Sequence, residues 1–487
     1  MVSKEKKLTV EDFIGQKDVV NCLSSLRQTF PGDKLVVSDV LDDKGNQYVD
    51  LVQKGGGVWG IALVGYTYVL EEMGIRFMKL AGTSAGAINT AMLTSIGTKQ
   101  DAKSKTVLQM LCDLDMFSFV DGHPFARRVI KKFITNKDFA KRIKSWLAIM
   151  AVILVFLIVG SMASLGLQHA YPAVHYVTIG IFVLLGIYIV LLGAIASYFV
   201  RLMNRLKNSG FGINPGDVFY DWVKKQMADH DVSTVQNLRD KASQPIPGLH
   251  LRGDRKEGVN DLKGSVALIT SEIVTENKIQ FPEMCDLFRP KDKEEELKPA
   301  GFVRASMSIP VFFESYYINR IPVDDPEVKA AWESRFQVKE PPTTTRFVDG
   351  GLLSNFPLNL FYNPNVHTPR LPTFGIDLIE IEKDKESKDP KDWSFGSYLG
   401  KMFNTIRDYY DKDFLLKNRI LEKGVGKVNM TGYNWLNFFM SDEDKLKMFA
   451  IGAQAAAAFL KEYKWDKFKE NREEYFEKMN AHKIEIK

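Results

Sequence analysis

The sequence has 487 residues, of which 45% are hydrophobic and 26% charged, and its net charge is +5 at pH 7. This length suits one large domain with appended segments. The mild positive charge, without basic residues interleaved with aromatic ones, argues against a nucleic-acid-binding protein. The three cysteines lack the spacing of metal ligands and are interpreted as free thiols of a reducing compartment. The oligomeric state is not defined by the sequence.

The first motif is a glycine triplet that follows a predicted strand, Tyr48–Gln53. Successive glycines after a strand can direct several backbone N–H groups toward one point, as an oxyanion hole requires. The same loop would also suit a phosphate group, and the motif alone does not separate these two roles. A helix is predicted after the loop, from about residue 61 to residue 73. The triplet consists of Gly55, Gly56 and Gly57.

The second motif, Gly82–Gly86, reads Gly-Thr-Ser-Ala-Gly and is a G-x-S-x-G pattern centred on Ser84. The apolar run Phe77–Ala81 before it is predicted as a buried strand, and Ala87–Leu93 after it as a helix. A serine on such a sharp turn projects its hydroxyl outward, and the helix N-terminus favours developing negative charge. An isolated match is equally compatible with a glycine-rich turn before a packed helix.

A long apolar segment, residues 145–200, contains no Asp, Glu, Lys or Arg. It divides at Gln168–Pro172, and each half exceeds the ~20 residues that a helix needs to cross a bilayer. A buried helical hairpin in a soluble core is the alternative, which we disfavour because soluble helices are seldom apolar on every face. The sequence therefore predicts a transmembrane hairpin.

Basic residues flank this segment on both sides, whereas the turn between its halves has none. The positive-inside rule then places both outer ends in the cytoplasm and the short turn outside. We therefore expect an integral membrane protein with two spans and a cytoplasmic catalytic domain. The flanking basic residues are Lys131, Lys132, Lys137, Lys141, Arg142, Lys144, Arg201, Arg205 and Lys207.

The third motif is Asp349 followed by Gly350 and Gly351, at the end of an apolar strand. A carboxylate there can approach a serine, although an Asp before two glycines is also an ordinary turn. A serine hydroxyl needs an adjacent base to act as a nucleophile. None of the seven histidines lies in a motif typical of a Ser-His-Asp triad. Asp349 is the best candidate base, and a surface histidine is the alternative.

Taken in this order, the three motifs resemble those of the patatin-like phospholipase family. The segment Val303–Phe313, with an Ala-Ser pair before a proline and two phenylalanines, resembles the family as well. The resemblance spans about residues 45–380 with one insertion. It implies that Ser84 is the nucleophile and Asp349 its base, without metal or cofactor. The implied oxyanion hole consists of the N–H groups of Gly55, Gly56 and Gly57.

One position departs from the family pattern. The family usually has Arg or Lys two residues after the glycine triplet, where this chain has Trp59. Because the oxyanion hole uses backbone donors, it does not depend on this side chain. Any role of the missing cation in positioning an anionic substrate is lost.

The resemblance implies an α/β patatin-like hydrolase with a central, mostly parallel sheet flanked by helices, interrupted by the membrane hairpin. The implied activity is that of a phospholipase A or lysophospholipase, acting on membrane phospholipid or another acyl lipid through an acyl-enzyme. A neutral-lipid lipase, an acyl-thioester hydrolase and a membrane-anchored scaffold with a decayed site are the alternatives. The expected organisation is a leader (1–44), a catalytic domain in two parts (45–144 and 201–385), the hairpin (145–200) and a C-terminal helical region that packs on the catalytic domain (386–487).

Overall fold

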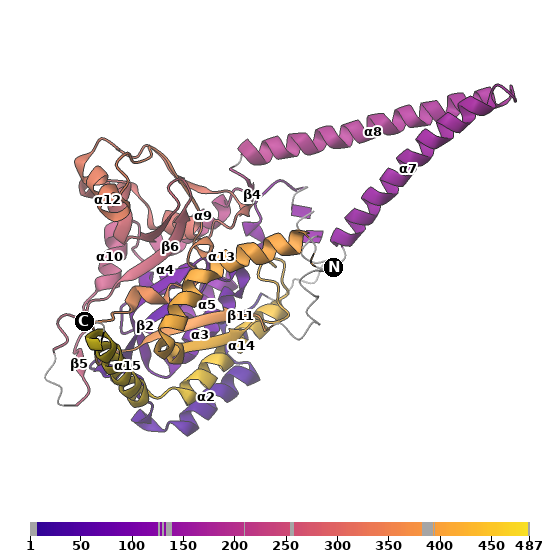
Figure 1. Cartoon of the computed structure of the whole chain (residues 1–487). Helices are drawn as coiled ribbons and strands as arrows, with labels where there is room; N and C mark the ends of the chain where they lie inside the picture. The colour runs from indigo at the N-terminus through magenta and orange to yellow at the C-terminus, as the bar shows by residue number, and fades with distance from the viewer. Residues whose placement is uncertain are drawn as a thin grey trace. The chain divides into compact units, whose positions relative to one another are not determined.

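The computed structural model describes residues 7–124, 127–128, 131–132, 139–208, 210–253, 258–381, 393 and 395–485. The chain forms two compact units (Figure 1). Unit 1 comprises Met1–Val120, Gly216–Pro310 and Ser315–Lys487, and unit 2 comprises Asp121–Pro215 and Val311–Glu314. The boundary expected between residues 385 and 386 lies outside the described residues, as does Lys137.

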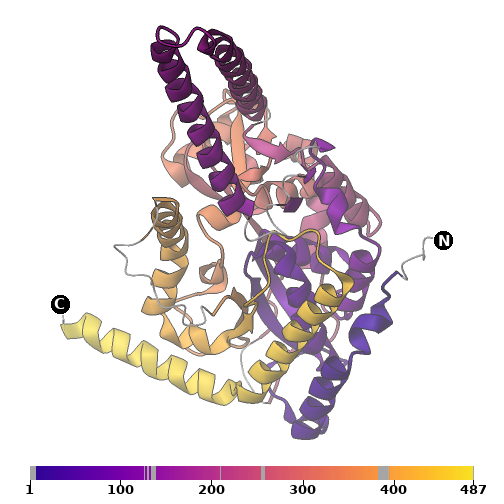
Figure 2. The ribbon, with the colours of Figure 1, turned by 90° about the vertical axis from the view of Figure 1, so that its right-hand side faces the viewer.

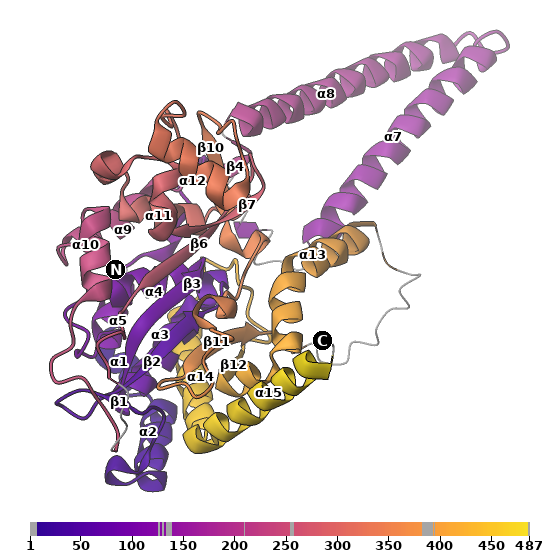
Figure 3. The same ribbon diagram turned by 60° about the vertical axis from the view of Figure 1, so that its left-hand side comes forward.

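Unit 1 is built around a mixed β-sheet whose middle strands are parallel (Figure 3). This arrangement confirms the predicted α/β class with a mostly parallel central sheet. In spatial order, the parallel strands are β12 (Val425–Asn429), β11 (Thr373–Ile379), β2 (Gln47–Gln53), β3 (Ile75–Thr83) and β6 (Val266–Glu272). The antiparallel strands are β10 (Thr345–Asp349), β9 (Tyr316–Ile318), β7 (Asn277–Phe281), β1 (Val40–Leu41) and β5 (His250–Leu251).

The central strands form the core of unit 1. Every residue of β2 and of β6 is buried, as expected for parallel strands covered on both faces. The helices that follow β2 and β3 are α3 (Gly60–Glu72) and α4 (Ala85–Ser95), so each strand leads directly into a helix. The other helices before residue 337 in unit 1 are α1 (Val10–Ile14), α2 (Lys17–Thr29), α5 (Ser104–Cys112), α9 (Asp217–Ala228), α10 (Val235–Ser243), α11 (Pro299–Ser306) and α12 (Pro326–Phe336).

The C-terminal region is closely attached to the sheet. It supplies the edge strand β12 and a helix, α14 (Asp442–Glu462), that crosses α3 so tightly that Gly65 and Gly452 have no room for a Cβ atom. The leader helix α2 lies beside α14 (Figures 1 and 2). Between them, Lys461 Nζ donates a hydrogen bond to Ser25 Oγ at 2.8 Å. The helices of this region are α13 (Phe395–Lys417), α14 (Asp442–Glu462) and α15 (Trp465–Glu485).

Unit 2 consists mainly of two long helices, α7 (Phe139–Leu167) and α8 (Val174–Asn208). Their apolar stretches, Lys144–Leu167 and Val174–Asn204, are 24 and 31 residues long and are apolar enough to cross a membrane. The Tyr188 hydroxyl donates to Met150 O at 2.8 Å, which joins the two helices. The remaining pairing in this unit is between the short parallel strands β4 (Gly212–Asn214) and β8 (Val311–Phe313).

Candidate active site

Ser84 lies on the sharp turn between β3 and α4. Its backbone has φ 53° and ψ −119°, a conformation that non-glycine residues rarely adopt and that costs about 1–3 kcal/mol. Gly82 and Gly86 lie against each other in this turn with no room for a Cβ atom between them. The Ser84 N–H donates to Ser306 Oγ at 2.9 Å, and its carbonyl accepts from the Ile88 N–H at 3.0 Å. The strained serine is therefore held by hydrogen bonds on both sides.

Asp349 ends β10, opposite Thr270 of β6, and its carboxylate lies beside the Ser84 hydroxyl. Its Oδ1 accepts a hydrogen bond from the Gly351 N–H at 2.7 Å. Burial raises the pKa of Asp349 to about 6, whereas the Ser84 hydroxyl, the Gly351 N–H and the charge of Arg407 act in the opposite direction. At pH 7 this carboxylate is ionised, so it can accept a proton from the serine.

The Ala-Ser segment connects the two candidate catalytic residues. Ser306, at the end of α11, accepts the hydrogen bond from Ser84 and donates its own hydroxyl to Ile269 O on β6. The carbonyl of Ser308, two residues later, accepts a hydrogen bond from the Asp349 N–H at 2.8 Å. One short segment thus positions both the serine and the carboxylate.

The glycine loop lies directly against Ser84. A Cβ atom on Gly55 would come within 3.1 Å of the Ser84 Cβ and would overlap the Asn355 side chain. The Gly55 N–H donates to Asn355 O at 3.0 Å, so this donor is already used. The N–H groups of Gly56 and Gly57 donate no hydrogen bond within the part of the chain that the structure describes. They follow Gly55 in the loop that lies against Ser84, and an oxyanion hole needs unbonded backbone donors of this kind.

Trp59 supports this loop by packing. Its side chain is only 8% exposed, and its Nε1–H donates to Tyr433 O at 3.2 Å. The neighbouring Val58 N–H donates to Trp435 O at 3.0 Å. These two hydrogen bonds therefore hold the glycine loop against residues 433–435.

An apolar cavity of about 70 Å³ adjoins the turn that carries Ser84. Gly57, Gly60 and Ala85 line the side of the cavity nearest to the serine. Apolar walls of this kind accept a hydrocarbon chain, which gains free energy by leaving water. The cavity walls are formed mainly by Ile61, Val64, Met92, Val107, Leu111, Phe119, Phe219, Trp222 and Phe438.

The loop after Asp349 is held by a residue that no sequence motif indicates. Asp411, on α13, accepts hydrogen bonds from Ser354 Oγ at 2.9 Å and from the Phe356 N–H at 2.7 Å. Thr83, next to the serine, donates its hydroxyl to Ser354 O at 3.0 Å. Only the fold brings Asp411 to this loop, so sequence reasoning had no signal by which to find it.

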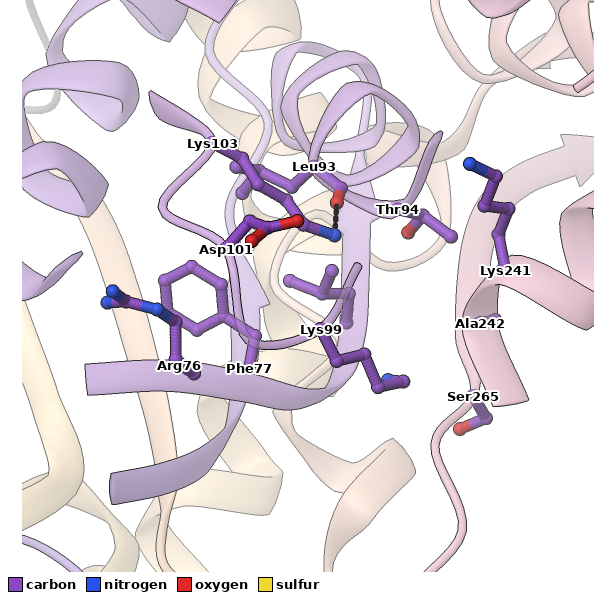
Figure 4. A pocket seen from close by; sticks show the side chains of 11 residues that line it. Arg76, Phe77, Leu93, Thr94, Lys99, Asp101, Lys103, Lys241, Ala242 and Ser265 are labelled. Carbon is purple, nitrogen blue, oxygen red and sulfur yellow. Dashed lines mark hydrogen bonds between the residues drawn. The ribbon is translucent and has the colours of Figure 1, made fainter. Parts of the chain in front are cut away.

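A smaller pocket, of about 20 Å³, lies beside the first half of β3 and the end of α4 (Figure 4). Lys103 Nζ donates to Leu93 O in the last turn of α4 at 2.7 Å, and Lys99 Nζ donates to Met78 O at 2.6 Å. Burial lowers the pKa of Lys99 to about 7 and that of Lys103 to about 8. Both amines satisfy buried carbonyl groups of the β3–α4 unit, and we assign this pocket a structural role.

No histidine shares a hydrogen bond with Ser84 or Asp349 in the described ranges of the chain. Within those same ranges, no group of three or more His, Cys, Asp or Glu residues is arranged to hold a metal ion. The carboxylate that the structure places beside the Ser84 hydroxyl is that of Asp349.

A mostly parallel α/β sheet with a strained serine beside an apolar cavity suits the lipid ester hydrolase class. The family model described as "Patatin-like phospholipase" matches residues 51–362, and the chain belongs to this family. Asp411, Trp435 and Phe438 lie beyond the matched residues, so part of the site comes from the C-terminal region.

The individual proteins that resemble this chain have low sequence identity to it. The uncharacterized protein YqhO of Bacillus subtilis (strain 168) is 25% identical over 416 residues, which cover 85% of this chain and 99% of that protein. The structure of VipD from Legionella pneumophila has a TM-score of 0.35 and 14% identity, covering 90% of this chain and 73% of that one. The ExoU–SpcU complex from the type III secretion system of Pseudomonas aeruginosa gives a TM-score of 0.29 and 15% identity, covering 86% and 52% of the respective chains.

Proposed function

We propose that this protein is a membrane-anchored lipid acyl hydrolase of the phospholipase A or lysophospholipase type, with Ser84 and Asp349 as its catalytic dyad. The observation that carries this proposal is the strained Ser84 beside the Asp349 carboxylate, with the glycine loop packed against the serine. Family membership supports a lipid ester as the substrate, and the apolar cavity beside Ala85 supports an acyl chain as the group bound there.

In the first half-reaction, Asp349 accepts the hydroxyl proton of Ser84 while the serine Oγ attacks the carbonyl carbon of the ester. The carbonyl oxygen becomes an oxyanion, which the N–H groups of Gly56 and Gly57 stabilise. Donors of this kind contribute about 10²–10³-fold each to the rate in other hydrolases. The carbon–oxygen bond to the lipid alcohol then breaks, and the alcohol leaves with the proton from Asp349.

In the second half-reaction, water attacks the carbonyl carbon of the acyl-serine and gives a proton to Asp349. The bond between the acyl carbon and Ser84 Oγ breaks, and Asp349 returns the proton to the serine. The products are the fatty acid and the free enzyme. The apolar cavity holds the acyl chain through both steps, so the carbonyl group stays beside Ser84.

We also propose that α7 and α8 cross the bilayer as a hairpin with both outer ends in the cytoplasm. The support is the 24- and 31-residue apolar stretches, which exceed the ~20 residues that a span needs, together with the basic residues at both outer ends. Two spans return the chain to the side from which it left. The strands before and after the hairpin can then form one sheet on the cytoplasmic side.

The direct test is covalent labelling of the full chain with a fluorophosphonate, which reacts only with an activated serine. We expect labelling of the wild type and of a control, Ser24→Ala, which changes an exposed serine on α2, and none of Ser84→Ala. Hydrolysis of phospholipid, lysophospholipid, triacylglycerol and acyl-thioester by the same proteins then identifies the substrate class. Absence of labelling in a folded wild type would indicate a scaffold with a decayed site.

A further inference from the structure

The helix α13, which Figure 3 shows beside the sheet, carries a row of large, exposed apolar side chains. At about 100° per residue, these side chains fall within an arc of roughly 80° on the helix surface. An exposed apolar row on one helix marks an interaction surface, because isolated apolar residues are ordinary but contiguous ones are not. This row, the α13 stripe, consists of four residues with exposed fractions of 46–66%: Tyr398, Met402, Ile406 and Tyr409.

The opposite side of the same helix holds the active-site loop. Asp411 lies roughly 180° around the helix from the middle of the stripe, and it accepts the hydrogen bonds from Ser354 and Phe356. The residue between them, Asn355, accepts the hydrogen bond from Gly55. The stripe and the loop that borders the active site are therefore separated by the thickness of one helix, about 10 Å.

We propose that the α13 stripe docks on the surface of a lipid bilayer. The stripe combines tyrosines with Met and Ile, and tyrosines are enriched where a protein meets the membrane–water interface. At its edges, Lys412 and Lys417 pair with Asp408 and Asp413 of the same helix at 3.3 and 2.6 Å, so the charges beside the stripe are balanced. The inference relies on the proposed hairpin for the presence of a bilayer, but not on hydrolysis.

Docking through this helix has a consequence for the substrate. A lipid in the contacted leaflet needs to move only about one helix thickness to reach the active-site loop. The same contact restrains α13, and with it the two hydrogen bonds that Asp411 makes to the loop. Membrane contact and order in the active site are thus linked through one element.

The experiment measures contact between the α13 stripe and lipid in a variant that lacks the candidate nucleophile. The full chain carries Ser84→Ala, has its three cysteines replaced by serine, and receives a single cysteine by Ile406→Cys, labelled with bimane. It is reconstituted in phosphatidylcholine–phosphatidylglycerol vesicles whose acyl chains are brominated near the headgroup. The matched control is Val20→Cys, at a residue that is 46% exposed on α2. Because an interfacial helix lies about 5–10 Å deep, we expect bromine to quench the label at 406 roughly fivefold more than at 20.

Equal quenching at the two positions would overturn the proposal. Iodide in the aqueous phase tests whether protein covers the stripe instead of lipid. A label at residue 406 that is protected from iodide but not quenched by bromolipid would lie against protein, and this result would also overturn the proposal. Since the protein is inactive by design, failure of the proposed hydrolase function would leave the quenching result unchanged.

A second measurement uses active protein. The double variant Ile406→Ser/Tyr409→Ser is expected to hydrolyse vesicle phospholipid roughly tenfold more slowly, because it loses apolar contact with acyl chains. A soluble ester should be hydrolysed at the wild-type rate, and Val20→Ser should change neither activity. An equal loss on both substrates would show that the stripe supports the protein rather than docking it, and would contradict the proposal.

Discussion

The Asp349 carboxylate should impose a measurable pH dependence on the reaction. Burial raises its pKa to about 6, and only the ionised form can accept the proton of Ser84. The rate constant kcat/KM should therefore rise with pH, reach half its maximum near pH 6 and level off above pH 7. At pH 5 roughly one tenth of the molecules carry the ionised base, so kcat/KM should be about one tenth of its plateau.

Substitution of Arg407 tests this pH dependence, because the charge of Arg407 lowers the pKa of Asp349. Arg407→Gln should move the acid limb to higher pH without removing either candidate catalytic residue. The assay is hydrolysis of a soluble chromogenic ester from pH 4.5 to pH 8, a range that extends roughly 1.5 units below and 2 units above the expected midpoint. Circular dichroism checks that the fold is unchanged. An Asp349→Asn protein that retains most of its activity with the same acid limb would refute the assignment and direct attention to a histidine.

The remaining predictions concern the dyad, the glycine loop and the membrane. Ser84→Ala and Asp349→Asn should each lower acyl hydrolysis ~10³-fold or more, with the double variant scarcely worse, because the two act as a unit; additive losses would contradict this. Trp59→Ala should lower the free energy of unfolding by roughly 3–5 kcal/mol, since a buried indole is removed; an unchanged denaturation midpoint would exclude the packing role. In a protein that lacks Cys22, Cys112 and Cys285, a single cysteine replaces either Ala170 or Lys207. In intact cells, the cysteine at 170 should react with an impermeant thiol reagent and the cysteine at 207 should not; the opposite pattern would invert the topology.

The candidate nucleophile was predictable because its geometry is local. A G-x-S-x-G pattern between an apolar run and a helix start specifies the strained turn at Ser84 within a few residues. Asp349 was indicated by its place at the end of a strand before two glycines and by the family resemblance, whereas its position beside Ser84 depends on the pairing of β10 with β6. The two long apolar helices were predictable because a long segment of the sequence has no charged residues.

The hydrogen bonds that complete the site were not predictable, because each joins residues that are distant in the sequence. The Gly55 N–H was expected in the oxyanion hole, but it donates to Asn355 O, a pairing that depends on how two loops meet. Asp411 is one of three aspartates on α13, and nothing in its sequence neighbours distinguishes it from the other two. The strand β12, from a region expected to be helical, is short and gains its stability from pairing with β11.

The position of the hairpin within the chain has a consequence for biogenesis. The central strands β2 and β3 are synthesised before α7 and α8, whereas their neighbours β11 and β6 are synthesised after them. Because chains emerge from the ribosome N-terminus first, Ser84 is made well before Asp349, the proposed base. The sheet cannot be completed until the residues after α8 have been synthesised. Under the proposed dyad, the nascent chain therefore has its serine but lacks its base while the two apolar helices emerge.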